Sequence, residues 1–120
     1  MAGQISKEKV NEVQARVISQ RDDIIKFLRD ICAIPSMDSK IGDVGKRIQD
    51  EMKKLKFDEV RFDKYGGTFG RIGNGKKVIV FDSHIDTVGV GDPTIWDWDP
   101  FVGEVKDGVF YARGACDEKG

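Results

Sequence analysis

The run Val78–Phe81 limits the fold more than any other feature, because its four consecutive residues are all apolar. A strand with one face in water alternates apolar and polar residues, whereas a strand covered on both faces is apolar throughout. The run therefore predicts a central strand with layers on both sides. It ends at Asp82-Ser83-His84. Ligands of open α/β sheets bind at the carboxyl ends of the strands, so a functional site is expected in the residues after Phe81.

Two amphipathic helices are expected before this strand, from Ser6 to about Ala33 and from Ser39 or Asp43 to Leu55. Pro35 ends the first helix. Their apolar residues recur at spacings of three, four or seven, which indicates one core-facing side on each helix. These residues are Val10, Val13, Val17, Ile24, Leu28 and Ile31 in the first helix, and Val44, Ile48, Met52 and Leu55 in the second.

Alternating patterns predict short strands at 60–62 and 68–72, with a hairpin signal at Gly73-Asn74-Gly75 before the central run. A second small hairpin is expected from 102–105 and 109–111. The order of these elements predicts the α/β class, with two helices followed by a mixed β-sheet.

Composition bounds the partners of the chain. Its 120 residues suffice for one domain, and 20 Lys and Arg against 21 Asp and Glu leave a net charge of -1. No nucleic-acid or membrane partner is expected from this balance. The N-terminal segment 1–7 has no apolar stretch of the kind found in signal peptides. Two distant cysteines, Cys32 and Cys116, fit a reducing cytoplasm better than a disulfide framework.

His84 is the only histidine, and Asp86 follows two positions later. On an extended segment, side chains at i and i+2 point the same way. A metal-ligating histidine usually gives its other ring N–H to a carboxylate or carbonyl. His84 is therefore a candidate ligand with Asp86 as its orienting partner. The alternative is an ordinary surface histidine at a strand end, because this short pattern is common.

A second carboxylate, Asp117, lies among the small residues of Arg113–Gly120. A carboxylate can bridge two divalent cations about 3.5–4 Å apart. The alternative for Asp117 is a turn residue that hydrogen-bonds its own backbone. Between the two candidates, the aromatic segment Trp96–Phe101 is expected to anchor a long loop to the core. Cys116 is interpreted as an inert small residue, since no second histidine exists to activate it.

Together these segments resemble the zinc-dependent amidohydrolase and exopeptidase superfamily, which includes aminoacylase, acetylornithine deacetylase, succinyl-diaminopimelate desuccinylase and glutamate carboxypeptidase. The order and spacing of the segments are more specific than any one of them, and His84–Phe101 is most similar to selenium-metabolism-linked hydrolases. The matching segments are Phe27–Ser36, Lys56–Val60, His84–Val88, Trp96–Phe101, Asp107-Gly108 and Arg113–Gly120.

The resemblance implies the fold and the roles of three residues. The fold is the N-terminal part of a zinc-peptidase-like three-layer α/β/α catalytic domain. His84 and Asp117 match metal ligands, with Asp117 bridging two zinc ions, for which Co²⁺ or Mn²⁺ are alternatives. Asp86 matches the catalytic carboxylate that orients His84. Ser83 stands where the family usually has glycine.

The same resemblance implies that residues 1–120 are the N-terminal portion of the catalytic domain. The rest of that domain, with a Glu-Glu pair and a distal histidine, and a dimerisation domain are absent. The complete enzyme is expected to be a homodimer. It would hydrolyse amide or peptide C–N bonds next to a carboxylate, in small peptides or N-acyl amino acids, by metal-activated water. The 120-residue chain alone is expected to be inactive. Two alternatives remain: a non-catalytic metal-binding or interaction module, and one half of a split enzyme completed by a downstream chain.

Overall fold

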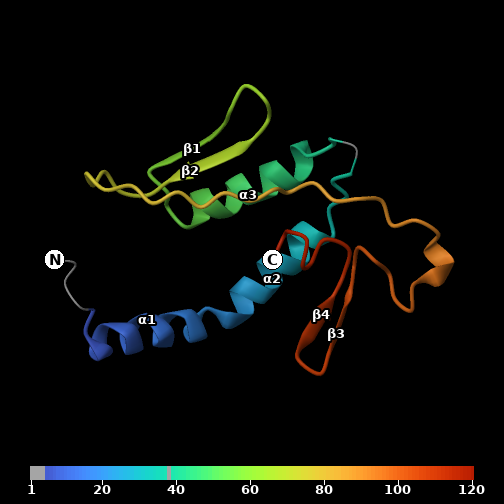
Figure 1. Ribbon diagram of the computed structural model, residues 1–120, viewed down its shortest axis with the longest axis horizontal. Coiled ribbons are helices and arrows are strands. Elements are labelled where there is room, and N and C mark those ends of the chain that lie inside the picture. The colour runs from blue at the N-terminus through green and yellow to red at the C-terminus, as the bar shows by residue number, and fades with distance from the viewer. Residues whose placement is uncertain (1–4, 38) are drawn as a thin grey trace.

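The computed structural model describes residues 5–37 and 39–120, so part of the N-terminal segment discussed above lies outside it. Three helices come first, α1 (Lys7–Ser19), α2 (Arg21–Cys32) and α3 (Gly42–Lys54). The strands β1 (Glu59–Phe62) and β2 (Thr68–Arg71) follow, and a short 3₁₀ turn, η1 (Pro93–Ile95), precedes the strands β3 (Glu104–Lys106) and β4 (Val109–Tyr111) (Figure 1). The α/β class predicted from the sequence is confirmed.

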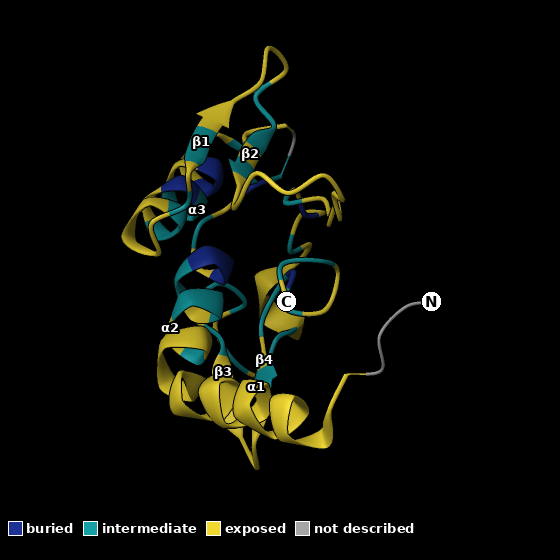
Figure 2. Ribbon diagram, turned by 90° about the vertical axis from the view of Figure 1, so that its left-hand side faces the viewer, coloured by how far each residue is buried: buried dark blue, intermediate teal, exposed yellow. Residues whose placement is uncertain are grey.

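The first expected helix is divided into two. Ser6 caps α1 as its hydroxyl accepts a hydrogen bond from the Lys9 N–H at 3.2 Å. The chain leaves helical geometry at Gln20, with φ -102° and ψ 7°. Helix α1 has no buried residue, and burial begins only at Ile31 and Cys32 near the end of α2 (Figure 2). An apolar stripe predicts a helix face but not its packing partner, and only α2 lies against α3.

The second expected helix is confirmed as α3, which carries the small core together with the β1–β2 hairpin. Val44 is fully buried. A Cβ added to Gly45 would lie 2.9 Å from the Phe62 ring, so glycine allows the hairpin to approach the helix closely. Arg47 joins α3 to α2 through an ion pair with Asp30 at 3.0 Å.

The sheets differ from the prediction. Strands β1 and β2 pair antiparallel, as do β3 and β4, so the described residues contain two separate hairpins and no mixed sheet. The run Val78–Phe81 is extended chain outside any strand, with 79–93 % of each residue exposed. A central strand needs hydrogen-bonding neighbours at both edges, and each hairpin pairs only within itself. The three-layer arrangement is therefore not formed among the described residues.

The chain is more open than a typical domain of its size. Its radius of gyration is 17.0 Å, against about 14 Å for a compact domain of this length. None of the helices among residues 5–37 and 39–120 is long and apolar enough to cross a membrane. The C-terminus returns to the end of α2 (Figure 1), and this return determines where the candidate residues meet.

Candidate metal centre

The segment that carries His84 is tied to the chain just after α2. The buried Ser36 hydroxyl donates a hydrogen bond to the Ile85 carbonyl at 2.8 Å. The Ser36 carbonyl in turn accepts one from the Thr87 N–H at 3.2 Å. These two bonds lie on either side of Asp86, so they hold the backbone of the segment although it is not part of a strand.

The turn that carries Asp117 follows β4. The Arg113 N–H donates to the Pro100 carbonyl at 2.7 Å, and the Lys119 N–H donates to the Gly114 carbonyl at 2.8 Å. Gly114 has φ +79°, a conformation that residues with a Cβ rarely adopt. A Cβ at this position would also lie 2.5 Å from the Thr87 methyl carbon. The two segments are therefore in close contact at Gly114 and Thr87.

This contact brings His84 and Asp117 together across 33 residues of sequence. The His84 Nε2 lies 3.0 Å from the Asp117 Oδ1 and 3.4 Å from the Glu118 Oε2. One nitrogen and two carboxylate oxygens lie within 4.8 Å of one another. Imidazole and carboxylate are the donors that Zn²⁺ takes in catalytic sites, where three protein ligands leave one position open. The residues present fit a divalent cation.

Solvent reaches this group of side chains. The exposed fraction is 46 % for His84, 44 % for Glu118 and 90 % for Asp117. The site opens into a shallow pocket of about 220 Å³, which His84, Asp86 and Asp117 help to line. A substrate and a water molecule would have access to a cation held there.

Asp86 contacts the other ring nitrogen of His84, mainly through its backbone. The His84 Nδ1 lies 3.1 Å from the Asp86 carbonyl oxygen and 3.5 Å from its carboxylate Oδ1. The shorter contact makes the carbonyl the better acceptor for the Nδ1–H. With that proton placed, Nε2 is the nitrogen available to a cation. The predicted orienting residue is in position, but its peptide oxygen makes the closer contact.

The pKa of His84 is raised above its ordinary value of 6.5. The hydrogen bond to the Asp86 carbonyl is the largest cause, and the Asp117 and Glu118 carboxylates act in the same direction. Partial desolvation opposes them. Without a cation, these contacts stabilise the protonated ring relative to that of a free histidine, because each of its two nitrogens then has an acceptor.

The loop between the two ligand candidates is anchored by its aromatic residues. The Trp96 indole N–H donates to the Val90 carbonyl at 2.9 Å. The Arg113 guanidinium lies 5.0 Å from the centre of the Trp96 ring, and the Trp98 ring centre lies 5.2 Å from that of Tyr111. These contacts join Trp96 and Trp98 to the loop itself and to the β4 region. None of them reaches the buried residues Ile31, Cys32 and Val44, so the expected anchoring to the core stays a prediction.

Glu118 and Lys119 were missed from the sequence. Residues 113–118 form a turn, in which side-chain directions follow no simple period, so nothing in the local pattern predicts that Glu118 joins Asp117 at His84. The pair of neighbouring carboxylates was the available signal. Cys116 is free and exposed and lies in the lining of the same pocket, so its interpretation as an inert small residue stays a prediction.

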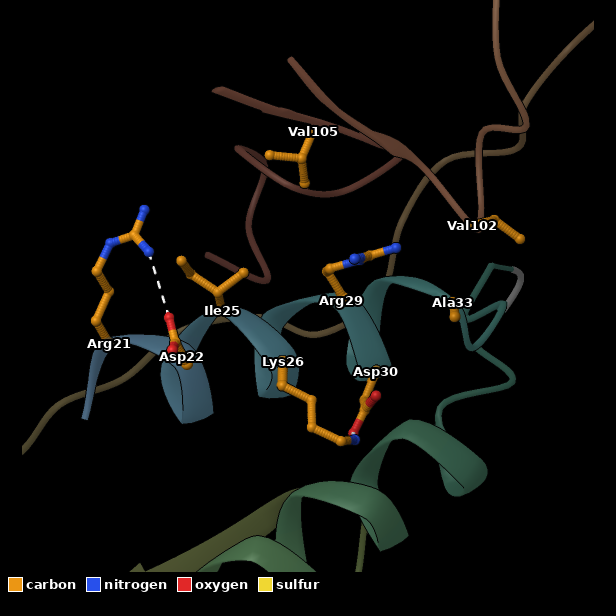
Figure 3. A pocket seen from close by; sticks show the side chains of 9 residues that line it. All are labelled: Arg21, Asp22, Ile25, Lys26, Arg29, Asp30, Ala33, Val102 and Val105. Atoms are coloured by element: carbon orange, nitrogen blue, oxygen red, sulfur yellow. Dashed lines mark hydrogen bonds and ion pairs between the residues drawn. The ribbon is translucent and has the colours of Figure 1, made fainter. Parts of the chain in front are cut away.

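A larger hollow, of about 640 Å³, lies between α2 and the hairpin region around β3 (Figure 3). Figure 3 shows charged side chains of α2 beside Val102 and Val105. Charges in this hollow pair with each other, as in Arg21 with Asp22 and Lys26 with Asp30. It contains none of the predicted site residues.

Comparison with known proteins identifies the family. The model of Peptidase family M20/M25/M40 matches residues 80–120, the segment that contains His84, Asp86 and Asp117. "Uncharacterized protein YgeY" of Escherichia coli (strain K12) is 41 % identical over 113 residues, covering 94 % of this chain and 26 % of the relative. The chain belongs to the M20/M25/M40 peptidase family. The recognition made from the sequence is thereby confirmed.

Two further relatives carry the name succinyl-diaminopimelate desuccinylase. That of Afipia carboxidovorans is 37 % identical over 103 residues, covering 80 % of this chain and 27 % of the relative. That of Rhodospirillum centenum is 32 % identical over 105 residues, covering 82 % and 27 %. The chain therefore belongs to a family of hydrolases, and it spans about a quarter of the length of the curated relatives it matches.

Proposed function

We propose that residues 1–120 are the N-terminal portion of a metal-dependent hydrolase catalytic domain, in which His84 and Asp117 hold divalent cations, Zn²⁺ foremost. The complete enzyme would hydrolyse amide or peptide C–N bonds next to a carboxylate, in small peptides or N-acyl amino acids. We expect it to be a homodimer in a reducing cytoplasm. The free state of Cys32 and Cys116 supports that compartment.

One observation carries the proposal: the 3.0 Å separation of the His84 Nε2 and the Asp117 Oδ1. These residues are the only histidine and the carboxylate that the family resemblance assigns to metal binding. A general tendency of carboxylates to gather would not explain why this particular pair meets from segments 33 residues apart. The names of the desuccinylase relatives support amide hydrolysis as the reaction.

The residues of the chain have distinct tasks in this proposal. His84 offers Nε2, because its Nδ1–H is held by Asp86. Asp117 and Glu118 supply the negative charge that a cation needs on the adjacent side. A bound divalent cation would lower the pKa of water and polarise the carbonyl of the substrate. The proton of the attacking water also needs an acceptor. We assign that role to the Glu-Glu pair of the longer family members, so we expect the chain alone to be inactive.

Cation binding is tested by titrating Co²⁺ into the metal-free 120-residue chain and following its visible absorption. We expect a saturable signal with the chain and none with His84→Ala or Asp117→Ala. Asp97→Ala removes another exposed carboxylate of the C-terminal region and serves as the matched control. Equal Co²⁺ binding by the chain and by His84→Ala would remove the basis of the proposal.

Hydrolysis is tested in a chimera in which residues 1–120 replace the matched segment of the Afipia carboxidovorans relative. N-acyl amino acids and dipeptides are the substrates assayed. We expect turnover by the chimera and none by its His84→Ala variant. A folded chimera that binds Co²⁺ without turnover would instead support a non-catalytic metal-binding module. Turnover only after a separate downstream chain is added would support a split enzyme.

A further inference from the structure

Both segments of the candidate metal centre are hydrogen-bonded to one short stretch of chain, Ile31–Ser36, at the end of α2. We propose that Ser36 and Lys119 are positioning residues that hold His84 and Asp117 at ligand distance by anchoring their segments to this stretch. The inference rests on the proposed function, since it concerns the same site. Neither residue is among those proposed to bind the cation.

Lys119 anchors the segment that carries Asp117 and Glu118. Its Nζ donates to the Ile31 carbonyl at 2.9 Å and to the Ile34 carbonyl at 2.8 Å. The last carbonyls of a helix have no intrahelical donor and carry partial negative charge, so an ammonium group is a favourable partner. Lys119 thus completes the end of α2 from a position more than 80 residues away in sequence.

Ser36 anchors the segment that carries His84. The side chain is fully buried, and its hydroxyl donates to the carbonyl of Ile85, the neighbour of His84. Its own carbonyl accepts from the Thr87 N–H. The His84 ring is held at Nδ1 by Asp86. The backbone on either side of Asp86, at Ile85 and Thr87, is hydrogen-bonded to Ser36.

The anchors are needed because the contact between the ligands is weak by itself. The Asp117 carboxylate is 90 % exposed and His84 is nearly half exposed. Exposed ion pairs contribute little to structure, since water screens the charges and the side chains lose freedom. The bonds made by Ser36 and Lys119 are partly buried and lead to the same six residues. Together with the contact between Gly114 and Thr87, they hold the two ligands at this separation.

Whether removal of the Lys119 ammonium weakens or strengthens cation binding distinguishes a positioning role from a simple charge effect. Removing the Lys119 ammonium removes a positive charge near the site, which by itself would strengthen the binding of a cation. Losing the anchor would weaken binding, because the carboxylates would no longer face Nε2. The two explanations predict opposite changes in the dissociation constant.

The test compares Co²⁺ dissociation constants of the 120-residue chain and its variants. We expect Lys119→Met and Ser36→Ala each to weaken binding by about tenfold or more, as is typical for residues that orient metal ligands. Lys119→Arg keeps a cationic donor and should recover most of the affinity. Lys106→Met and Ser19→Ala are exposed matched controls expected to bind like the wild type. Binding by Lys119→Met as tight as that of the wild type, or tighter, overturns the inference.

A core variant distinguishes a general loss of stability from a loss of ligand positioning. Val44→Ala opens a cavity at a fully buried position of α3 and leaves the hydrogen-bonding groups of Ser36 and Lys119 unchanged. We expect a lower unfolding temperature for this variant with unchanged Co²⁺ affinity of the folded fraction. Weakened Co²⁺ binding by Val44→Ala equal to that of Lys119→Met would show that loss of stability alone explains the effect, and would overturn the inference.

A metal-free measurement tests the inference even if the chain binds no cation. His84 is the only histidine, so its ring gives one set of NMR signals. At one fixed pH, Asp117→Ala defines the ring signals without the partner carboxylate. We expect Lys119→Met and Ser36→Ala to shift the ring signals toward that reference, and Lys106→Met to leave them in place. Absence of Co²⁺ binding by the wild type counts against the proposed function. Unshifted ring signals in both anchor variants count against the positioning inference.

Discussion

Replacing Gly114 by alanine should destabilise the chain much more than the same change at Gly108. The two glycines have the same backbone conformation, with φ +79° at each. They differ in their surroundings. A Cβ at Gly114 would lie 2.5 Å from the Thr87 methyl carbon, whereas a Cβ at Gly108 would meet no atom within 4 Å. The pair therefore separates the cost of backbone conformation from the cost of the contact between the two site segments.

The expected magnitudes follow from this difference. Placing alanine in the left-handed region costs about 1–2 kcal/mol at either position. At Gly114 the distance from the new Cβ to the Thr87 methyl carbon would be about 1 Å shorter than an ordinary carbon–carbon contact. Such overpacking costs about 1–3 kcal/mol more. We expect the free energy of unfolding to fall by about 1–2 kcal/mol in Gly108→Ala and by about 2–5 kcal/mol in Gly114→Ala.

Urea unfolding of the two variants and the wild type measures these differences. A Thr87→Ser background removes the methyl carbon that the new Cβ would strike. In that background Gly114→Ala should recover at least about 1 kcal/mol, a coupling expected of residues in contact. Equal losses for Gly114→Ala and Gly108→Ala, or no recovery with Thr87→Ser, would refute the close contact of the two segments.

Four further predictions concern the candidate metal centre and the loop beside it. In the metal-free chain, NMR titration should give His84 a pKa above 6.5, because the Asp86 carbonyl and the two neighbouring carboxylates favour the protonated ring. The stability that these contacts add is present below 6.5 and is lost as the pH rises through the raised pKa. Cation affinity should show the opposite trend, falling about tenfold per pH unit below the raised pKa because the Nε2 proton must leave. A Co²⁺ dissociation constant that does not change with pH would contradict this. Glu118→Gln should weaken Co²⁺ binding while leaving the unfolding temperature near that of the wild type, and unchanged affinity would exclude the carboxylate from the donor set. Trp96→Phe should lower the free energy of unfolding by about 1 kcal/mol, because the hydrogen bond to the Val90 carbonyl is lost. Urea unfolding measures this difference, and an unchanged stability would show that the bond contributes nothing.

The helix α3 was predicted well, because the apolar residues that indicate a helix are only three or four positions apart in sequence. Helix α3 lies within the bounds expected from its apolar spacing. The break at Gln20 was not predicted: Gln20 and Arg21 interrupt the apolar stripe, but no proline or glycine marks a helix end there. The central strand predicted at Val78–Phe81 was wrong for the described residues. Apolar residues indicate that a segment should be covered, but the covering strands must come from elsewhere in sequence.

The candidate site was predicted in part. His84, Asp86 and Asp117 were singled out by residue type, spacing and resemblance, and the structure brings them into one group. Glu118, Ser36 and Lys119 were not, because their relevant contacts join positions from 34 to 88 residues apart or depend on a turn geometry. No local period encodes such contacts.

The sequence by itself determined which donor groups the chain can offer a cation: one imidazole, and carboxylates on either side of a long loop. It also determined the helical stretches, because helix formation depends on neighbours three and four residues away. Only the tertiary structure decided that the His84 and Asp117 segments meet. Their meeting depends on hydrogen bonds from both segments to the end of α2, and such bonds exist only once distant parts of the chain have been brought together.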